Sequence, residues 1–467
     1  MLFTSPSFAL FLPVMLAAYW STQGAVRRCV LLTGSYFFYG WWDWRFLGLL
    51  WVSTFVDFIA AGRIARSAQP AGRRRWLVVS LVTNLGILGA FKYYGFFADS
   101  LVAMMAPLGI TLSGPTVDLL LPMGISFYTF QSMSYSIDVY RGAPAERSFI
   151  TFALYVACFP QLVAGPIMRA SSLLPQLATD RKPSDVRLTD GAFRLMLGLI
   201  KKLILADSLA LYVDMVFADP SAYPGVSSWI ALYAYAFQIF LDFSGYTDMA
   251  IGIGHLLGLR FVENFDRPYL SRSPSEFWRR WHISLSTWLR DYLYVPLGGS
   301  RGGRLLTCRN LAITMALGGL WHGAAWTFVA WGLFHGALLC AERAWRWFVV
   351  PSESDRRGVS PVTHFVQVIL MFHATCLGWL LFRSQDWAQV VEMLRNLTTF
   401  PETGVHGLRV LCIVLFCAVL HVARFDRLRQ FVERRIPAFG QGALAALGLW
   451  SVLLLSPNAR PFIYFQF

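Results

Sequence analysis

The sequence is poor in charged residues. Asp, Glu, Lys and Arg make up only 14% of its 467 residues, whereas a soluble globular protein carries about 25%. Hydrophobic residues account for 56% of the chain and aromatic residues for 16%. No polar stretch is long enough to fold as a soluble domain of about 100 residues. The composition therefore predicts an all-α, polytopic membrane protein with a single membrane domain over residues 1–467.

The cysteines form neither a metal site nor a redox motif. None belongs to a CxxC pair or to a Cys/His zinc spacing, and most lie inside apolar runs. We therefore expect small buried hydrophobic residues and no metal. No basic region and no cleavage signal accompany the first apolar run, so we expect Phe8–Trp20 to be retained as a first span.

The net charge of +14 does not indicate a nucleic-acid partner. The arginines gather in short loops between apolar segments, which is the positive-inside pattern of membrane proteins. Binding to nucleic acid would require a soluble basic face, and the sequence offers none. We therefore expect these residues to meet membrane lipids, with no nucleic acid involved.

Apolar segments recur along the whole chain. A full span needs roughly 20 residues, and several segments are shorter, so we expect about 11 to 13 membrane-embedded helices. Residues 148–165 end in Phe159–Pro166, which is typical of a broken, re-entrant helix. The segments are 6–22, 29–44, 46–61, 76–97, 118–140, 148–165, 195–218, 228–252, 309–330, 331–349, 362–382, 407–423 and 441–457.

The charged residues inside these segments include two lysines and two aspartates. Lys201 and Lys202 are expected to extend their ammonium groups to the cytoplasmic interface. Asp242 and Asp248 are six residues apart and so lie on different faces of a helix, which argues against a paired acid/base site. We expect each carboxylate to pair with an arginine or to cap a helix break.

His322 lies about ten residues inside the apolar run Ala312–His335, among glycines and alanines. Small residues allow a neighbouring helix or a substrate to come close. Ionisable groups at such depth are costly and usually face the interior of a helix bundle. From this run alone, a structural histidine bonded to a carbonyl and a functional histidine are both open.

A second histidine lies on a predicted amphipathic helix. Ser273-Pro-Ser-Glu276 resembles a capping box with Pro at the first helical position. His282 lies next to the apolar stripe of this helix, which we place at the cytoplasmic interface. A histidine in such a position is more often solvated than functional. The stripe consists of Phe277, Trp281, Leu285, Trp288 and Leu289.

Several motifs together resemble the membrane-bound O-acyltransferase family. They are the segments Glu276–Trp288, Leu320–His322, Asp242–Ala250 and Leu121–Gln131. The similarity covers nearly the whole chain, and its branch is that of the bacterial alginate O-acetylases and their relatives in cellulose and peptidoglycan acetylation. The resemblance implies a ring of membrane helices around a central funnel. It places the family's invariant His at His322 and a second polar position, Asn or His, at His282.

The resemblance also implies an activity. Members of this branch take an acetyl group from a cytoplasmic donor, acetyl-CoA, and pass it across the bacterial inner membrane. The final acceptor is an exported polysaccharide, reached with periplasmic acetyltransferase or esterase-like partners. The sequence leaves open whether that polymer is alginate, cellulose or peptidoglycan.

The chemistry suggests a role for each site residue. Acyl transfer to a hydroxyl needs a base, and a buried neutral imidazole suits His322 to that role. His282 would orient the donor or hydrogen-bond the thioester carbonyl. Arg279 and Arg280 would attract the CoA phosphates or, equally, anchor the chain at lipid headgroups. Trp321 is assigned to the donor side.

Two other functions compete with the enzyme. A transporter or flippase of a polysaccharide precursor could use Asp242, Asp248 and the histidines as a proton relay. Such a transporter would be favoured by an inverted repeat, which is not evident in the sequence. A structural scaffold for polysaccharide export would not require a buried His322. The two-histidine pattern favours the enzyme.

The asymmetry of the arginine loops gives a topology prediction. Arg63–Arg75 and Arg424–Arg435 should face the cytoplasm, whereas Asp99–Asp118, which has no Lys or Arg, should lie outside together with the N-terminus. Single cysteines in these loops, labelled with an impermeant reagent on intact cells, should react only in Asp99–Asp118. Labelling of Arg63–Arg75 from outside would reverse the orientation.

Overall fold

The computed structural model is predominantly helical in the part of the chain that it describes. It describes residues 1–112, 114, 119–163, 165–348, 360–399, 407–423, 435, 460 and 463. Within these ranges all regular elements are helices and there is no strand, so the prediction of an all-α protein is confirmed. The chain divides into two compact units, which are Met1–Leu195 with Met249–Val262, and Met196–Asp248 with Glu263–Phe467. The single domain and the central funnel stay predictions.

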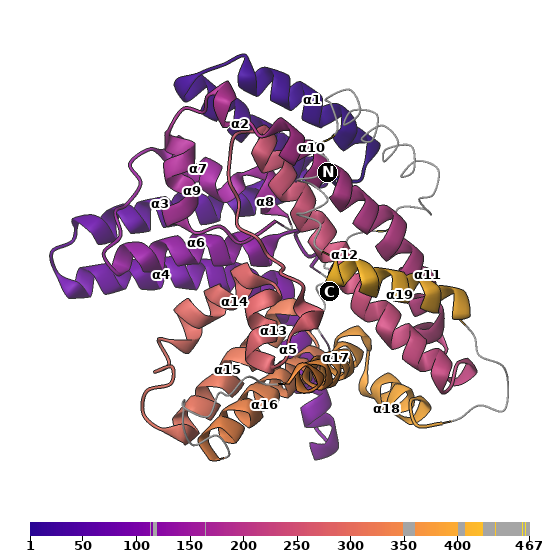
Figure 1. The fold of residues 1–467 in the computed structure, drawn as a ribbon. Helices are drawn as coiled ribbons and strands as arrows, with labels where there is room; N and C mark the ends of the chain where they lie inside the picture. Colours follow the sequence, from indigo (N-terminus) through magenta and orange to yellow (C-terminus); the bar gives the residue numbers. More distant parts are fainter. Residues whose placement is uncertain are drawn as a thin grey trace. The chain divides into compact units, whose positions relative to one another are not determined.

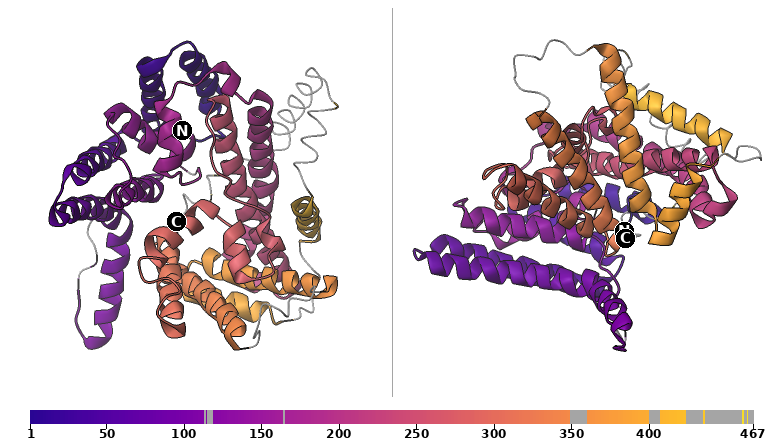
Figure 2. Two further views of the ribbon diagram at one scale, coloured as in Figure 1. Left: turned by 60° about the vertical axis from the view of Figure 1, so that its left-hand side comes forward. Right: turned by 90° about the horizontal axis from the view of Figure 1, so that it is seen from below.

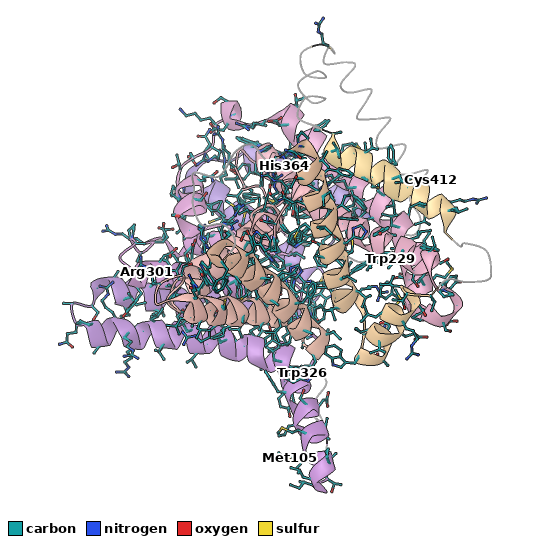
Figure 3. The ribbon with its side chains drawn as sticks, turned by 60° about the horizontal axis from the view of Figure 1, so that its bottom comes forward. Met105, Trp229, Arg301, Trp326, His364 and Cys412 are labelled. Atoms are coloured by element: carbon teal, nitrogen blue, oxygen red, sulfur yellow. The ribbon has the colours of Figure 1, made fainter. Side chains whose placement is uncertain are left out.

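In the first unit, α3, α4 and α6 lie side by side (Figure 1). A π-helix, Gly89–Tyr93, continues α4 into α5, at whose far end Met105 lies (Figure 3). Asp99, expected in a loop, therefore belongs to a helix. The helices are α1 (Pro6–Trp20), α2 (Gly24–Gly40), α3 (Leu47–Arg66), α4 (Pro70–Leu88), α5 (Tyr94–Met105), α6 (Ile125–Tyr140), α7 (Phe149–Ala157), α8 (Phe159–Leu162), α9 (Ala170–Ala178) and the start of α10 (Leu188–Leu199).

A buried carboxylate joins α3, α4 and α6. Asp57 of α3 is fully buried and accepts hydrogen bonds from Ser80 Oγ at 2.5 Å and from Asn84 Nδ2 at 2.8 Å, both on α4. Ser132 of α6 donates a third. Because a buried carboxylate is costly unless its oxygens are hydrogen-bonded, these polar contacts fix how the three helices pack.

The predicted break in segment 148–165 is present. Helix α7 ends at Ala157, Cys158 leaves the helical conformation, and α8 begins at Phe159 with Pro160 in its first turn. Proline lacks a backbone N–H and is tolerated in the first turn of a helix, so its position explains where α8 starts. The re-entrant path through a membrane stays a prediction.

In the second unit, α15 and α16 form a tightly packed pair (Figure 2). Helix α18 was not among the predicted segments, and segment 441–457 lies outside the described residues, as does most of Arg424–Arg435. The helices are the end of α10, α11 (Asp207–Ala218), α12 (Val226–Leu256) up to Asp248, α13 (Pro274–Arg280), α14 (Ile283–Leu289), α15 (Arg304–His322), α16 (Trp326–Phe348), α17 (Pro361–Arg383), α18 (Trp387–Asn396) and α19 (Leu408–Val422).

Four described helices are long and apolar enough to cross a membrane. They are Trp44–Arg66, Pro70–Leu108, Val226–Leu256 and Pro361–Arg383. The most apolar window of Val226–Leu256 is 78% buried within the protein, so this helix is an interior one. The pair α15–α16 is not among the four, and the expected total of embedded segments stays a prediction.

The predictions of an outward-facing Lys202 and of arginine partners or helix breaks for Asp242 and Asp248 were wrong. Lys202 is only 2% exposed and bridges Asp207 at 2.8 Å and Asp242 at 2.9 Å. Lys201 pairs with Asp248 at 2.6 Å. Helix α12 is unbroken, so neither aspartate caps a break, and each pairs with a lysine rather than an arginine. A lysine that turns inward must find a counter-charge there, and α12 supplies it.

The contact between α15 and α16 depends on glycine. A Cβ at Gly319 of α15 would overlap the backbone oxygen of Phe328, and a Cβ at Gly332 of α16 would overlap that of Met315. The two backbones thus touch directly, as in helix pairs built on small residues. This close approach fixes the end of α15, where His322 lies, against α16.

Two neighbouring glycines allow a matched test of this contact. Gly319→Ala should destabilise the protein by about 1–3 kcal/mol, because backbone atoms cannot move aside for the added methyl group. Gly318→Ala should cost less, since its Cβ would meet only the flexible side chain of Leu289, at 3.1 Å. Thermal unfolding in detergent measures both. Equal loss of stability would show that the backbone contact is not limiting.

Candidate active site

The helical conformation is interrupted between α13 and α14, at His282. Ser273 caps α13 by accepting a hydrogen bond from Glu276 N at 3.3 Å, and Pro274 occupies the first turn, as the sequence predicts. The helix then ends, because Trp281 is extended (φ −102°, ψ 128°) and His282 is left-handed (φ 42°, ψ 56°). A left-handed conformation is uncommon for any residue but glycine. The break turns the imidazole inward.

The prediction of one amphipathic helix at the membrane interface was wrong. The apolar stripe is buried within the unit and does not face lipid: Phe277 and Trp281 are 0% exposed and Leu285 is 1% exposed. His282 is itself 0% exposed, so it is not a solvated interfacial residue. The periodicity identified the apolar face correctly, but it could not reveal a break of two residues.

Asn264 orients the imidazole of His282. Its Oδ1 accepts a hydrogen bond from the backbone N of Ser284 at 3.1 Å, which identifies this atom as the oxygen. The same Oδ1 lies 3.2 Å from His282 Nδ1, so Nδ1 carries the proton and donates. In the neutral ring, Nε2 then carries no hydrogen and bears the lone pair. His282 is thereby prepared to accept a hydrogen bond or a proton at Nε2.

Burial keeps His282 neutral. Loss of solvent around the ring lowers the pKa of His282 to about 3, from an ordinary value of 6.5. The imidazole is therefore uncharged near neutral pH.

His322 is the last residue of α15, not a residue in the middle of a span. The apolar run Ala312–His335 divides after His322, since Gly323 is extended (φ −157°, ψ 151°) and α16 starts only at Trp326. A Cβ at Gly323 would overlap the ring of Phe328, so a larger residue at this turn would displace that ring. The predicted boundary between residues 330 and 331 was too late, and His322 lies at a helix end.

The structure brings the two histidines together. Their ring centroids are 6.4 Å apart, although forty residues separate them in sequence. The ring of Trp321 lies 5.0 Å from that of His322 and 6.1 Å from that of His282. Three of the five residues predicted for the site therefore form one cluster. His322 is 3% exposed, so the cluster is buried.

Aromatic rings from three other helices enclose this pair. Phe243 of α12 lies edge-on to His282 at 4.6 Å. Trp331 of α16 and Phe382 of α17 lie edge-on to His322 at 5.0 and 5.4 Å. Such walls exclude water and strengthen the electrostatic interactions between the groups inside.

The two predicted arginines do not join the cluster in the same way. Arg280 donates to Glu276 Oε1 at 2.8 Å, an ion pair within α13 that occupies its guanidinium group. Arg279 is exposed and remains available for an anion. A role of either residue in binding the acyl donor stays a prediction.

Sequence reasoning missed Asn264 and Trp331. Asn264 lies eighteen residues before His282, in a segment without a recognisable motif. Trp331 belongs to an apolar run in which any tryptophan could equally face lipid. Neither residue lies in one of the four segments that carry the family resemblance.

The helical fold and the paired histidines are those of a membrane enzyme with a buried histidine site. The model of the membrane-bound O-acyltransferase family matches residues 140–383, which hold both histidines. The chain belongs to this family and is a membrane-bound O-acyltransferase.

Similar proteins include bacterial O-acetylases. The "Probable alginate O-acetylase AlgI" of Azotobacter vinelandii is 46% identical over 405 residues, covering 86% of this chain and 79% of that protein. The protein of the same name from Pseudomonas putida is 40% identical and is aligned over 100% of both chains. The peptidoglycan O-acetyltransferase of Helicobacter pylori is 33% identical, over 85% of this chain and 80% of that protein.

Asn264 provides a test of the histidine site. Asn264→Ala should lower the rate of acyl transfer by about tenfold, because one neutral hydrogen bond contributes about 0.5–1.5 kcal/mol and without it His282 can adopt either tautomer. Ser284→Ala is the control: it removes a hydroxyl bonded to the same Oδ1, at 2.9 Å, but leaves the bond to the imidazole. If both variants lost the same activity, the loss would come from a disturbed loop around Ser284 and not from a changed tautomer of His282.

Proposed function

We propose that this O-acyltransferase is an O-acetyltransferase of the bacterial inner membrane, which the chain crosses several times. It takes acetyl groups from cytoplasmic acetyl-CoA and passes them across that membrane. The acceptor beyond the membrane is an exported polysaccharide of the alginate type. The names of the relatives support acetylation, and the 40–46% identity to alginate O-acetylases favours alginate over peptidoglycan, where the identity is 33%. The family assignment leaves the flippase and scaffold alternatives without support.

One observation carries the proposal. Two buried imidazoles, one of them held in a defined tautomer, face each other at a centroid distance of 6.4 Å within aromatic walls. Acyl transfer needs a proton acceptor beside the attacking hydroxyl and a site from which water is excluded. A small reacting group between the two rings would contact both.

His322 acts as the general base. The hydroxyl oxygen of the acceptor attacks the thioester carbonyl carbon, and the imidazole of His322 takes the hydroxyl proton. The tetrahedral intermediate then collapses, the bond from carbon to sulfur breaks, and the protonated His322 returns the proton to the thiolate. A positioned base contributes roughly 10²–10⁴ in rate.

His282 holds the hydroxyl for this step. Its neutral ring cannot donate a hydrogen bond to the thioester carbonyl, since Asn264 takes the only N–H at Nδ1. Because the attacking hydroxyl has a single hydrogen, which goes to His322, the ring of His282 instead holds the acceptor beside His322 by direct contact. This differs from the carbonyl-polarising role expected from the sequence.

The donor and the partners complete the proposal. Arg279, exposed on α13, attracts the phosphates of CoA, and Trp321 lies against the acyl end of the donor. Periplasmic acetyltransferase or esterase-like proteins carry the acetyl group from the membrane to the polymer.

Variants of the two histidines test the assignment. His322→Ala should abolish acetyl transfer while acetyl-CoA binding stays near normal, because a base acts mainly in the transition state. His282→Asn should lower the rate by about tenfold, since asparagine tolerates the left-handed backbone but reaches less far than an imidazole. The measurements are acetylation of the polymer in cells and acetyl-CoA turnover and binding by purified protein, at matched expression.

The control is His364→Ala, a half-buried histidine of α17 that contacts Arg272. This variant should keep wild-type activity. If His322→Ala retained most of the activity and His282→Asn lost it, His282 would be the base. If the wild-type protein did not turn over acetyl-CoA at all, the proposed donor would be wrong.

A further inference from the structure

A third buried histidine lies next to the candidate site. His335 of α16 is 0% exposed, and neither of its ring nitrogens has a hydrogen-bond partner within the described residues. Burial of an imidazole without hydrogen bonds is unfavourable, whereas an apolar side chain would occupy the same place without that cost. The residue type at this position therefore calls for an explanation other than stability.

His335 contacts the surroundings of His322 through one ring. Trp331 lies one helical turn earlier on α16, and its ring is 5.0 Å from that of His335. The same tryptophan lies 5.0 Å from the ring of His322, at 86°. Trp331 is thus held between the two imidazoles, so a displacement of His335 would be transmitted to His322.

A second path leads from His335 to His282. The ring of Phe277 stacks on that of His335 at 5.7 Å and 10°, and on that of Trp281 at 5.7 Å and 12°. Trp281 directly precedes His282 at the break between α13 and α14. The orientation of His335 therefore also affects the backbone that presents His282.

The space around the imidazole matches a five-membered ring. A Cβ placed on Gly378 of α17 would lie 2.9 Å from His335 Nε2, closer than ordinary van der Waals contact. A phenyl ring at position 335 is longer than an imidazole and would come closer to Gly378. The small imidazole ring fits beside Gly378. This fit explains why position 335 carries a histidine, although burial of a phenylalanine side chain would be more favourable.

We propose that His335 is a positioning residue: through Trp331 on one side and through Phe277 and Trp281 on the other, it sets the spacing of His322 and His282. The proposal rests on the proposed function only in that these two histidines carry out the acyl transfer. His335 itself takes no part in the proton transfers.

Chemical labelling tests this inference without any substrate. Full-length protein in detergent is treated with diethyl pyrocarbonate, and the modification rate of each histidine is followed by mass spectrometry. In His335→Ala, His322 and His282 should react at least about fivefold faster, because the aromatic wall that encloses them loosens. His364 should react at its wild-type rate. Unchanged rates at His322 and His282 would overturn the proposal, as would a uniform rise at all histidines, which indicates general unfolding.

A glycine variant approaches the same ring from the opposite side. Gly378→Ala should raise the same two rates by displacing the imidazole toward Trp331. Gly86→Ala is the matched control, since no atom lies within 4 Å of the position of its Cβ. If Gly378→Ala left the two histidines as protected as the control does, the fit between Gly378 and His335 would have no effect on the site.

Turnover distinguishes positioning from donor binding. For His335→Ala we expect kcat to fall at least tenfold while KM for acetyl-CoA stays within twofold, as for a residue that affects only the transition state. A raised KM with unchanged kcat would contradict the proposal and place His335 in donor binding. A wild-type protein inactive with acetyl-CoA would contradict the proposed donor alone, and the labelling result would still decide the role of His335.

Discussion

Polar groups in the interior of this protein must find their partners within the chain, and that constraint shapes both units. Asp57 gathers two serines and an asparagine from neighbouring helices, and Lys202 is enclosed by two aspartates. In each case the apolar surroundings make an unpaired charge far more costly than in water. The helices therefore pack where these groups meet, and the apolar side chains fill the remaining space.

The same constraint distinguishes the three buried histidines in and beside the candidate site. His282 has an acceptor, Asn264, which determines its tautomer. His322 ends a helix among aromatic rings, and His335 lies in a purely aromatic environment. All three residues are histidines, but their neighbours give them different chemical properties. One cluster can therefore contain a histidine whose proton is held in place and another that transfers a proton.

Much of the helical framework could be predicted from the sequence, because the signals are local. The Ser273 cap and the Pro274 start follow from neighbouring residues, and the apolar run of α12 is long enough to be unmistakable. The inward turn of Lys202 was not predictable, since its counter-charges come from two different helices. The break at His282 likewise depends on Asn264, whose side chain bonds to His282 and whose backbone oxygen accepts a hydrogen bond from Ile283 N.

In the candidate site, too, local features could be predicted from the sequence and long-range contacts could not. Its residue types could be named from the sequence because His322 and His282 lie in recognisable stretches, but the burial of His282 and the helix-end position of His322 were misjudged. An interpretation based on periodicity assumes a continuous helix. Both histidines lie at helix ends: α15 ends at His322, and His282 lies at the break between α13 and α14. Helix ends are where side chains can converge from separate segments, so the error falls at the functional residues.

The left-handed backbone at His282 restricts which sequences can carry this site. With φ at 42°, the position penalises most side chains, and β-branched ones most strongly. Histidine and asparagine are among the few residues that occupy this region readily, and these are the two that the family resemblance assigns to the position. The backbone conformation thus limits which substitutions are tolerated. Histidine and asparagine could replace one another within a lineage while the turn keeps its conformation. Valine or isoleucine would require a different backbone path.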